Sequence, residues 1–154
     1  MTGKRVAWAL CAAWMGLIFL MSAIPGDLSS RESGFFVDLL LCLLSFCFGE
    51  RASAIDPDFL HLLVRKAAHI AEYFVLFLLY RRALRLSGVA HPGILALLLC
   101  ALYAVTDEFH QSFVDDRGPS PADVCIDTAG AALSWVCAGV CDLVLKRTHK
   151  RSKA

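Results

Sequence analysis

Three segments of the chain carry ionisable side chains at helical spacing, each within or beside a run of apolar residues. The first, Asp107-Glu108-Phe109-His110-Gln111, ends an apolar run that begins near Pro92. The other two groups consist of Lys66, His69, Glu72 and Tyr73, and of Arg117, Asp123 and Asp127. A charge at the centre of a spanning helix costs roughly 2.5–3.5 kcal/mol, so such residues seldom lack a role. The sequence therefore predicts a functional site where the three groups meet.

The spacing within the second and third groups places their members on one side of a helix. Positions i, i+3 and i+7 are held by Lys66, His69 and Tyr73. Glu72 follows His69 by three residues, so an acid lies one turn beyond the imidazole. Asp127 follows Asp123 by four residues and lies one turn deeper on the same face. Each helix would thus present a polar stripe to its neighbours.

The first group divides into two strips on its helix. Positions i, i+4 and i+7 are held by Tyr103, Asp107 and His110, and the adjacent strip holds Glu108 and Gln111. Glu108 and Gln111 also suit an ordinary helix end that emerges into water. Asp107 is harder to explain in this way, because a buried carboxylate needs a cation or a strong donor beside it.

Such a cluster permits three kinds of chemistry. The candidates for general acid or base catalysis are Asp107, Glu108 and His110. The carboxylates could instead hold a divalent cation with His69 or His110, although no H-E-x-x-H spacing is present. Lys66 and Arg117 could clamp an anionic headgroup such as phosphate. The structural alternative is a network of ion pairs that only locks the helices together, with Ser120 or Asp123 capping the last helix.

The composition indicates an integral membrane protein. The 154 residues suit a single domain, and 58% of them are hydrophobic, against roughly 45–50% apolar residues in soluble domains. The mean hydropathy is +0.61. The net charge of +1 conceals a split between an acidic segment at 25–60 and a basic tail after Leu145. We interpret this split as a signal of orientation and not of nucleic-acid binding.

The seven cysteines are scattered through apolar stretches and form no C-x-x-C pair. We interpret them as small packing residues, not as zinc ligands or a disulfide framework. Only Cys137 and Cys141, at i and i+4, could form a pair on one helix face. The cysteines therefore indicate no metal site, and the sequence does not identify a cofactor.

Four apolar runs approach the length of about 20 residues that a membrane span requires, at 6–24, 67–84, 93–113 and 122–145. The first run is longer than the apolar region of a cleaved signal peptide, so we interpret it as an uncleaved anchor. Basic residues precede the first run, separate the second from the third and follow the fourth. Under the positive-inside rule, both termini then face the cytoplasm.

A shorter apolar segment at 35–48 is interrupted by Asp38 and is too short to cross the membrane unaided. A fifth crossing would also send one basic terminus outward, so we expect an interfacial or re-entrant helix in the first outer loop. The sequence therefore predicts an all-α membrane protein with four spans in one domain at 1–154. The three polar groups would lie at one depth, about 7–9 Å below the outer edge of the hydrocarbon core.

The motifs in these segments resemble those of a known family. They read K-x-x-H-x-x-E-Y from Lys66 and Y-x-x-x-D-E-x-H-Q-x-F from Tyr103, followed by Arg117, Asp123, Asp127 and Gly130. Together with Ser22-x-x-Pro25, this pattern is similar to that of the VanZ-like family of small bacterial membrane proteins. That family is named for an accessory protein of glycopeptide-resistance clusters that raises teicoplanin resistance.

Two positions depart from the family pattern. Asp115-Asp116 stands where the family usually has Pro-Gly before the turn arginine, which would alter the shape of the loop. Asp127 stands where the family commonly has asparagine, and it adds a potential charge.

The resemblance implies a protein of the bacterial inner or plasma membrane that acts at its outer face, where teicoplanin meets peptidoglycan precursors. We expect an outward-facing site that binds an anionic lipid-linked headgroup or a lipophilic glycopeptide, with membrane lipids around it and no nucleic acid as a partner. The alternative is a membrane-embedded enzyme that acts on lipid or peptidoglycan precursors. The oligomeric state stays open. The expected ligand-binding residues are Lys66, His69, Glu72, Tyr73, Tyr103, Asp107, Glu108, His110, Gln111, Arg117, Asp123 and Asp127.

Overall fold

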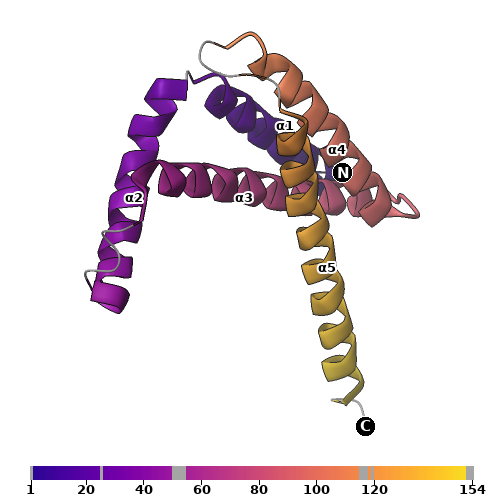
Figure 1. Ribbon diagram of the computed structural model, residues 1–154. Coiled ribbons are helices and arrows are strands. Elements are labelled where there is room, and N and C mark those ends of the chain that lie inside the picture. The colour runs from indigo at the N-terminus through magenta and orange to yellow at the C-terminus, as the bar shows by residue number, and fades with distance from the viewer. Residues whose placement is uncertain (1, 25, 50–54, 115–117, 119, 152–154) are drawn as a thin grey trace.

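The computed structural model describes residues 2–24, 26–49, 55–114, 118 and 120–151, and these residues contain helices but no strand. Figure 1 shows the five helices, which are α1 (Thr2–Ser22), α2 (Gly26–Phe48), α3 (Pro57–Leu86), α4 (Pro92–Gln111) and α5 (Pro121–Arg151). The prediction of an all-α protein is confirmed within these ranges.

Local sequence explains where three of the helices begin. Pro57, Pro92 and Pro121 are the first residues of α3, α4 and α5, a position where the missing proline N–H costs nothing. Asp56 caps α3, because its side chain accepts a hydrogen bond from the backbone N–H of Asp58 at 3.0 Å. After α3 ends, Gly88 adopts a φ of +76°, in the left-handed region that favours glycine at helix ends.

The helices differ in length from the apolar runs that predicted them. α3 begins at Pro57 instead of 67, because the cap and proline start the helix before its apolar part. α2 extends over Gly26–Phe48 instead of 35–48, and only Gly34–Cys47 forms its apolar part. α1 and α4 each end two residues earlier than predicted, at Ser22 and Gln111. Apolar runs thus locate the helices, whereas a cap and a proline set the start of α3.

Three helices are long and apolar enough to cross a membrane, namely Thr2–Ser22, Pro92–Gln111 and Pro121–Thr148. α3 has 30 residues but is interrupted by charged side chains at 65, 66, 72, 81 and 82. Composition therefore supports three of the four predicted crossings, and the crossing by α3 stays a prediction.

α3 is the helix that holds the fold together. It contacts each of the other four helices, and among the described residues α2 contacts only α3. Figure 1 shows α3 lying across the molecule between α2 on one side and the group of α1, α4 and α5 on the other. Tyr73, Leu76 and Phe77 of α3 are fully buried at the centre of this arrangement. Side chains on α3 are therefore placed to meet residues from several helices.

A glycine allows α5 to approach α3 closely. A Cβ built on Gly130 would lie 2.5 Å from the backbone carbonyl oxygen of Ile70, which is closer than any real contact. Small residues at such crossings let helix backbones pack without intervening side chains, as is common in membrane proteins. This close approach sets the distance between the polar stripes of α3 and α5.

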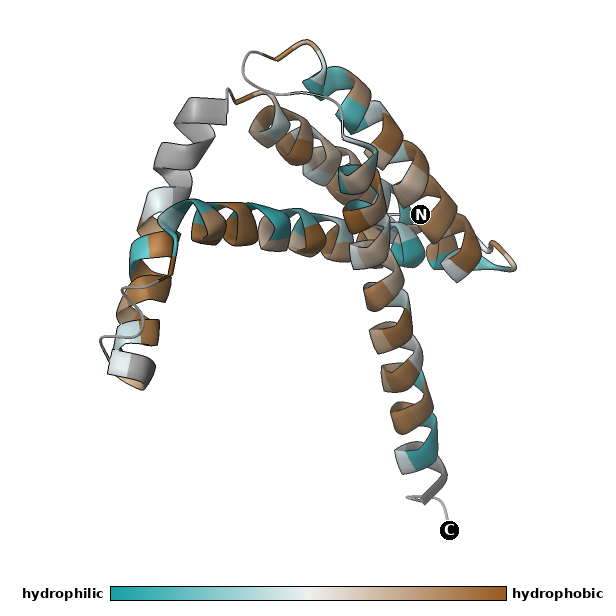
Figure 2. Cartoon of the chain, viewed as in Figure 1, coloured by the Kyte–Doolittle hydropathy of each residue, from teal (hydrophilic) through white to brown (hydrophobic). Residues whose placement is uncertain are grey.

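Polarity is distributed in the opposite way from that of a soluble protein. Large apolar side chains such as Leu102, Phe109 and Val136 are exposed, whereas Asp127 and Ser134 are fully buried. Figure 2 shows hydrophobic residues along most of α5 and hydrophilic residues along one side of α3. Such a surface is stable when lipid is the solvent. The chain is therefore a membrane protein.

Candidate functional site

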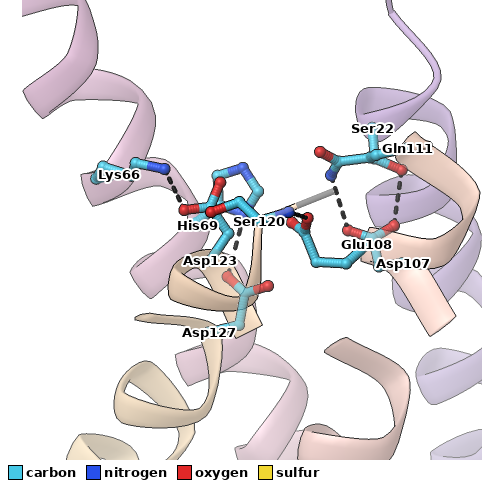
Figure 3. A network of polar contacts seen from close by, with 9 residues as sticks. All are labelled: Ser22, Lys66, His69, Asp107, Glu108, Gln111, Ser120, Asp123 and Asp127. Carbon is cyan, nitrogen blue, oxygen red and sulfur yellow. Dashed lines mark hydrogen bonds and ion pairs between the residues drawn. The ribbon is translucent and has the colours of Figure 1, made fainter. Parts of the chain in front are cut away.

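Polar side chains from four helices gather where α1 and α4 end and α5 begins, against the middle of α3. Figure 3 shows the cluster, in which the residues joined by hydrogen bonds or ion pairs are Ser22, Lys66, His69, Asp107, Glu108, Gln111, Ser120, Asp123 and Asp127. We call this set the polar cluster. It contains seven of the twelve residues that the sequence predicted to bind a ligand.

α3 and α5 are joined by two adjacent pairs. The ammonium group of Lys66 donates to the carboxylate of Asp123, and Nδ1 of His69 lies 3.1 Å from Oδ1 of Asp127. Lys66 and His69 are three residues apart and therefore share one face of α3. Asp123 and Asp127 are four residues apart and share one face of α5 in the same way. The side chain of Asp127 is completely buried, whereas those of Lys66 and Asp123 are partly exposed.

α4 and α1 are joined through Asp107. Oδ1 of Asp107 accepts a hydrogen bond from the hydroxyl of Ser22 at 2.7 Å, and Oδ2 accepts one from the amide of Gln111 at 3.3 Å. All three residues are buried. Asp107 therefore receives two neutral donors, where the sequence suggested a cation or a strong donor.

Glu108 connects α4 to the start of α5. Its Oε2 accepts a hydrogen bond from the backbone N–H of Ser120 at 2.8 Å. The carbonyl of Ser120 in turn accepts the N–H of Asp123 at 2.9 Å, so Ser120 also leads into the first turn of α5. Glu108 and Gln111 are both about 4% exposed. The interpretation of these two residues as a helix end emerging into water is therefore wrong.

The α3–α5 pairs and the α1–α4 pairs form one electrostatic unit. Asp127 interacts electrostatically with Asp107 and Asp123, and Glu108 interacts with Asp123, Asp127 and His69. Figure 3 shows the carboxylate of Glu108 reaching from α4 toward the first turns of α5. The convergence that the sequence predicted for α3, α4 and α5 is thus present.

Three buried oxygen atoms in this region have no hydrogen-bond partner among the described residues: Oε1 of Glu108, Oδ2 of Asp127 and the hydroxyl of Tyr73. Tyr73 is completely buried and interacts electrostatically with both Asp127 and Asp107, so it belongs to the same electrostatic unit. Leaving a buried polar group without a partner costs about 1–3 kcal/mol, and native proteins rarely tolerate several together. These atoms therefore keep hydrogen-bonding capacity that the described residues do not use.

The strip of Tyr103, Asp107 and His110 faces α1. The hydroxyl of Tyr103 donates to the carbonyl of Met15 at 2.6 Å, and the ring of His110 lies 4.0 Å from that of Phe19, measured between centroids. Nδ1 of His110 is buried and has no described partner. Tyr103 and His110 therefore position α1, and they lie on a different side of α4 from Glu108.

The remaining expected residues are less directly involved. Glu72 is half-buried and interacts electrostatically with His69, while its backbone carbonyl accepts a hydrogen bond from Trp14 at 3.0 Å. Arg117 lies outside the described residues, so its predicted contact with an anionic group stays a prediction. Cys137 and Cys141 are free and exposed on α5.

Two members of the polar cluster were not predicted as ligand-binding residues. Ser22 was noted only as part of the Ser-x-x-Pro pattern that closes the first apolar run, and Ser120 only as a helix cap. A polar residue at the last position of an otherwise apolar helix was the available signal for Ser22. No signal could reveal the contact of Ser120, because its backbone and not its side chain binds Glu108.

The cluster is rich in carboxylates but does not resemble a metal centre. Among the residues that the structure describes, no group of three or more His, Cys, Asp and Glu side chains is arranged to hold a metal ion. What the geometry offers is hydrogen-bond acceptance by Glu108 and Asp127, and an imidazole on His69 that is oriented through its Nδ1. Both features suit a polar organic ligand or proton transfer.

Comparison with known proteins identifies the family. The chain matches the family model described as VanZ/LLP1 over residues 7–142, which includes the whole polar cluster. Neither the curated proteins nor the solved structures show a significant match to it. The family model covers most of the chain, in agreement with the motifs from Lys66 and Tyr103. The chain therefore belongs to the VanZ/LLP1 family.

Proposed function

We propose that this protein crosses the bacterial plasma membrane four times, with both termini in the cytoplasm and the polar cluster near the outer surface. Three helices qualify as spans by composition. α3 can serve as the fourth because two of its basic side chains are paired: Lys66 binds Asp123, and Arg81 binds Asp142 at 2.5 Å. Lys66 and Arg81 are separated by about 22 Å along the helix, so the two ion pairs would lie near opposite surfaces of the bilayer.

At the outer surface, the polar cluster binds the polar part of an amphipathic envelope molecule, such as a lipid-linked cell-wall precursor or a lipophilic glycopeptide. The observation that carries this proposal is a pair of buried carboxylate oxygens, Oε1 of Glu108 and Oδ2 of Asp127, that have no partner in the described part of the chain. A ligand that supplies hydrogen-bond donors would remove the cost of leaving them unsatisfied. Membership of the VanZ/LLP1 family and the resemblance to VanZ favour a glycopeptide-related role, including teicoplanin resistance.

The test of binding compares two acidic residues at opposite ends of the bundle. Full-length protein and the variants Glu108→Gln and Asp142→Asn would be purified in detergent and titrated with a lipid-linked precursor and with teicoplanin. We expect Glu108→Gln to weaken binding about tenfold, because a charge-assisted hydrogen bond is lost. Asp142→Asn is the matched control, since Asp142 binds Arg81 and Arg85 far from the cluster. Equal affinity of all three proteins, or no binding at all, would contradict the proposal.

A catalytic role is the second candidate, and the contact of His69 with Asp127 favours it. A carboxylate that holds Nδ1 of an imidazole fixes its tautomer and leaves Nε2 to exchange protons with a substrate. Glu108 would be the second acid or base. Incubation of the purified protein with lipid-linked precursors, followed by mass spectrometry of the lipids, tests this role. If no product forms across a range of pH and with added divalent metals, the binding function stands alone.

A further inference from the structure

The polar cluster contains more acids than bases in the part of the chain that the structure describes. Its carboxylates are Asp107, Glu108, Asp123 and Asp127, and its basic side chains are Lys66 and His69. Lys66 is already bound to Asp123, and His69 to one oxygen of Asp127. Each base therefore already has one carboxylate partner, and the two acids from α4 have no ion pair among the described residues.

Among the described residues, the two acids from α4 have only neutral hydrogen-bond partners. Asp107 accepts from Ser22 and Gln111, and Glu108 accepts from the backbone of Ser120. Both side chains are almost completely buried. A buried carboxylate is costly unless a positive charge or several donors compensate it. The described hydrogen-bond partners of these two acids consequently supply no positive charge.

The unpartnered atoms define what would compensate this shortage. Oε1 of Glu108, Oδ2 of Asp127 and the hydroxyl of Tyr73 are all buried and have no described partner. Asp127 connects them, because it interacts electrostatically with both Glu108 and Tyr73. Tyr73 is 0% exposed, so its hydroxyl cannot be satisfied by bulk water. Three buried oxygen atoms that can accept hydrogen bonds therefore belong to one group of electrostatically interacting residues.

We propose that the group recognised between Glu108, Asp127 and Tyr73 is a primary ammonium group on the bound molecule. An ammonium carries one positive charge and three N–H donors, which matches three unpartnered oxygens in an acidic environment. A phosphate would be repelled by the same carboxylates, and a quaternary ammonium has no N–H to donate. The inference rests on the proposed binding function and changes the expected ligand chemistry from an anionic to a cationic group.

Phospholipids with different headgroups provide a direct test. Full-length protein in detergent would be titrated with phosphatidylethanolamine, phosphatidylcholine and phosphatidylglycerol, and retained lipid would be counted by native mass spectrometry. We expect phosphatidylethanolamine to bind at least about tenfold more tightly than the other two, because only it combines charge with N–H donors. Equal retention of all three lipids, or a preference for phosphatidylglycerol, would overturn the inference.

Competition with a soluble amine tests whether the ammonium group must belong to a phospholipid. If ethanolamine competes with the lipid, or binds when no lipid does, the ammonium itself is recognised and need not belong to a phospholipid. Failure of both the lipid and ethanolamine to bind would contradict the inference. A lipid-linked precursor that binds equally well before and after acetylation of its amino groups would also contradict it, while leaving the proposed function intact.

Single-residue variants then test where the ammonium group binds. Tyr73→Phe removes only a hydroxyl that has no described partner, so the fold should persist while affinity for phosphatidylethanolamine falls a few-fold. Glu108→Gln should reduce this affinity about tenfold, and Asp142→Asn should not change it. Thermal unfolding in detergent would show that each variant is folded. Unchanged affinity in folded Tyr73→Phe and Glu108→Gln would place the ammonium elsewhere and refute the assignment.

Discussion

Among single residues, Asp127 has the most demanding environment. Its carboxylate is completely buried, contacts His69 with one oxygen and has no described partner for the other. In the family pattern this position commonly holds asparagine, which could bind His69 without adding a charge. The aspartate therefore ties the stability of the α3–α5 contact to His69 more strongly than an amide would.

Removing His69 should show how strongly the stability of the α3–α5 contact depends on the pair of His69 and Asp127. His69→Ala leaves a buried carboxylate without its imidazole, and we expect the free energy of unfolding to fall by about 3–5 kcal/mol. Lys66→Ala should cost less, because Lys66 is 24% exposed and water can reach Asp123 after its removal. Chemical denaturation in mixed micelles would measure both. The double variant His69→Ala/Asp127→Ala should lose less than the sum of the single losses, and strict additivity would show that the two residues do not interact.

Gly130 offers a second test at a single position. Gly130→Ala would place a Cβ 2.5 Å from the backbone oxygen of Ile70, which no side-chain movement can relieve. We expect a loss of about 1–3 kcal/mol as α3 and α5 are forced apart, together with weaker ligand binding. Gly139→Ala in the same helix is the control, because a Cβ added there would meet nothing within 4 Å and alanine favours helices. If both variants melt at the same temperature, the close helix crossing is not required.

At the scale of helices, α1 is attached to the bundle by side chains that reach backbone groups. Trp14 donates to the carbonyl of Glu72 in α3 at 3.0 Å, and Tyr103 of α4 donates to the carbonyl of Met15 at 2.6 Å. Ser22 at the end of α1 then meets Asp107. These contacts align α1 so that its last residue enters the polar cluster.

Two tyrosines that both contact Met15 allow this attachment to be tested. Tyr103 donates to the carbonyl oxygen of Met15, whereas Tyr80 donates to its thioether sulfur at 2.9 Å. Sulfur is a weak acceptor, so Tyr103→Phe should lower the unfolding free energy by about 1 kcal/mol and Tyr80→Phe by less. Thermal unfolding in detergent compares the two. A larger loss for Tyr80→Phe would show that the carbonyl contact does not hold α1.

The sequence predicted which residues share a helix face better than it predicted which residues contact one another between helices. Helical spacing correctly placed Lys66 with His69 and Asp123 with Asp127, because residues three or four apart share a helix face whatever surrounds them. It did not show that Glu108, and not His110, faces α5. That outcome depends on how α4 is rotated against its neighbours, and rotation is set by packing over the whole helix.

The helix ends were predictable where neighbouring residues in the sequence determine them, whereas contacts between distant segments were not. The start of α3 at Pro57 follows from Asp56 and proline, which are local signals that an apolar run does not include. The contact between Ser22 and Asp107 joins residues 85 positions apart, and no periodicity in either segment encodes it. Local chemistry thus predicts where helices lie, whereas the site emerges only after they pack.

For the whole molecule, the arrangement of charge distinguishes its two ends. One end carries the acidic polar cluster, and the other carries Asp142 between Arg81 and Arg85, with further basic residues toward the end of α5. The basic end matches the cytoplasmic side under the positive-inside rule. An acidic site at the outer surface and a basic inner surface are the combination expected if α3 crosses the membrane with α1, α4 and α5.

Reporter fusions in a bacterial host decide between four crossings and three. If α3 crosses, the termini share one side, so a fluorescent protein fused after α5 should be fluorescent in the cytoplasm and alkaline phosphatase at the same position inactive. Truncation at Gly118 removes α5 and should reverse both signals, which provides an internal control. If instead α3 lies along the surface, only the three helices that qualify by composition cross, and the full-length phosphatase fusion becomes active. The pairing of Lys66 with Asp123 favours the first outcome, because an unpaired lysine on α3 would resist insertion by roughly 2.5–3.5 kcal/mol.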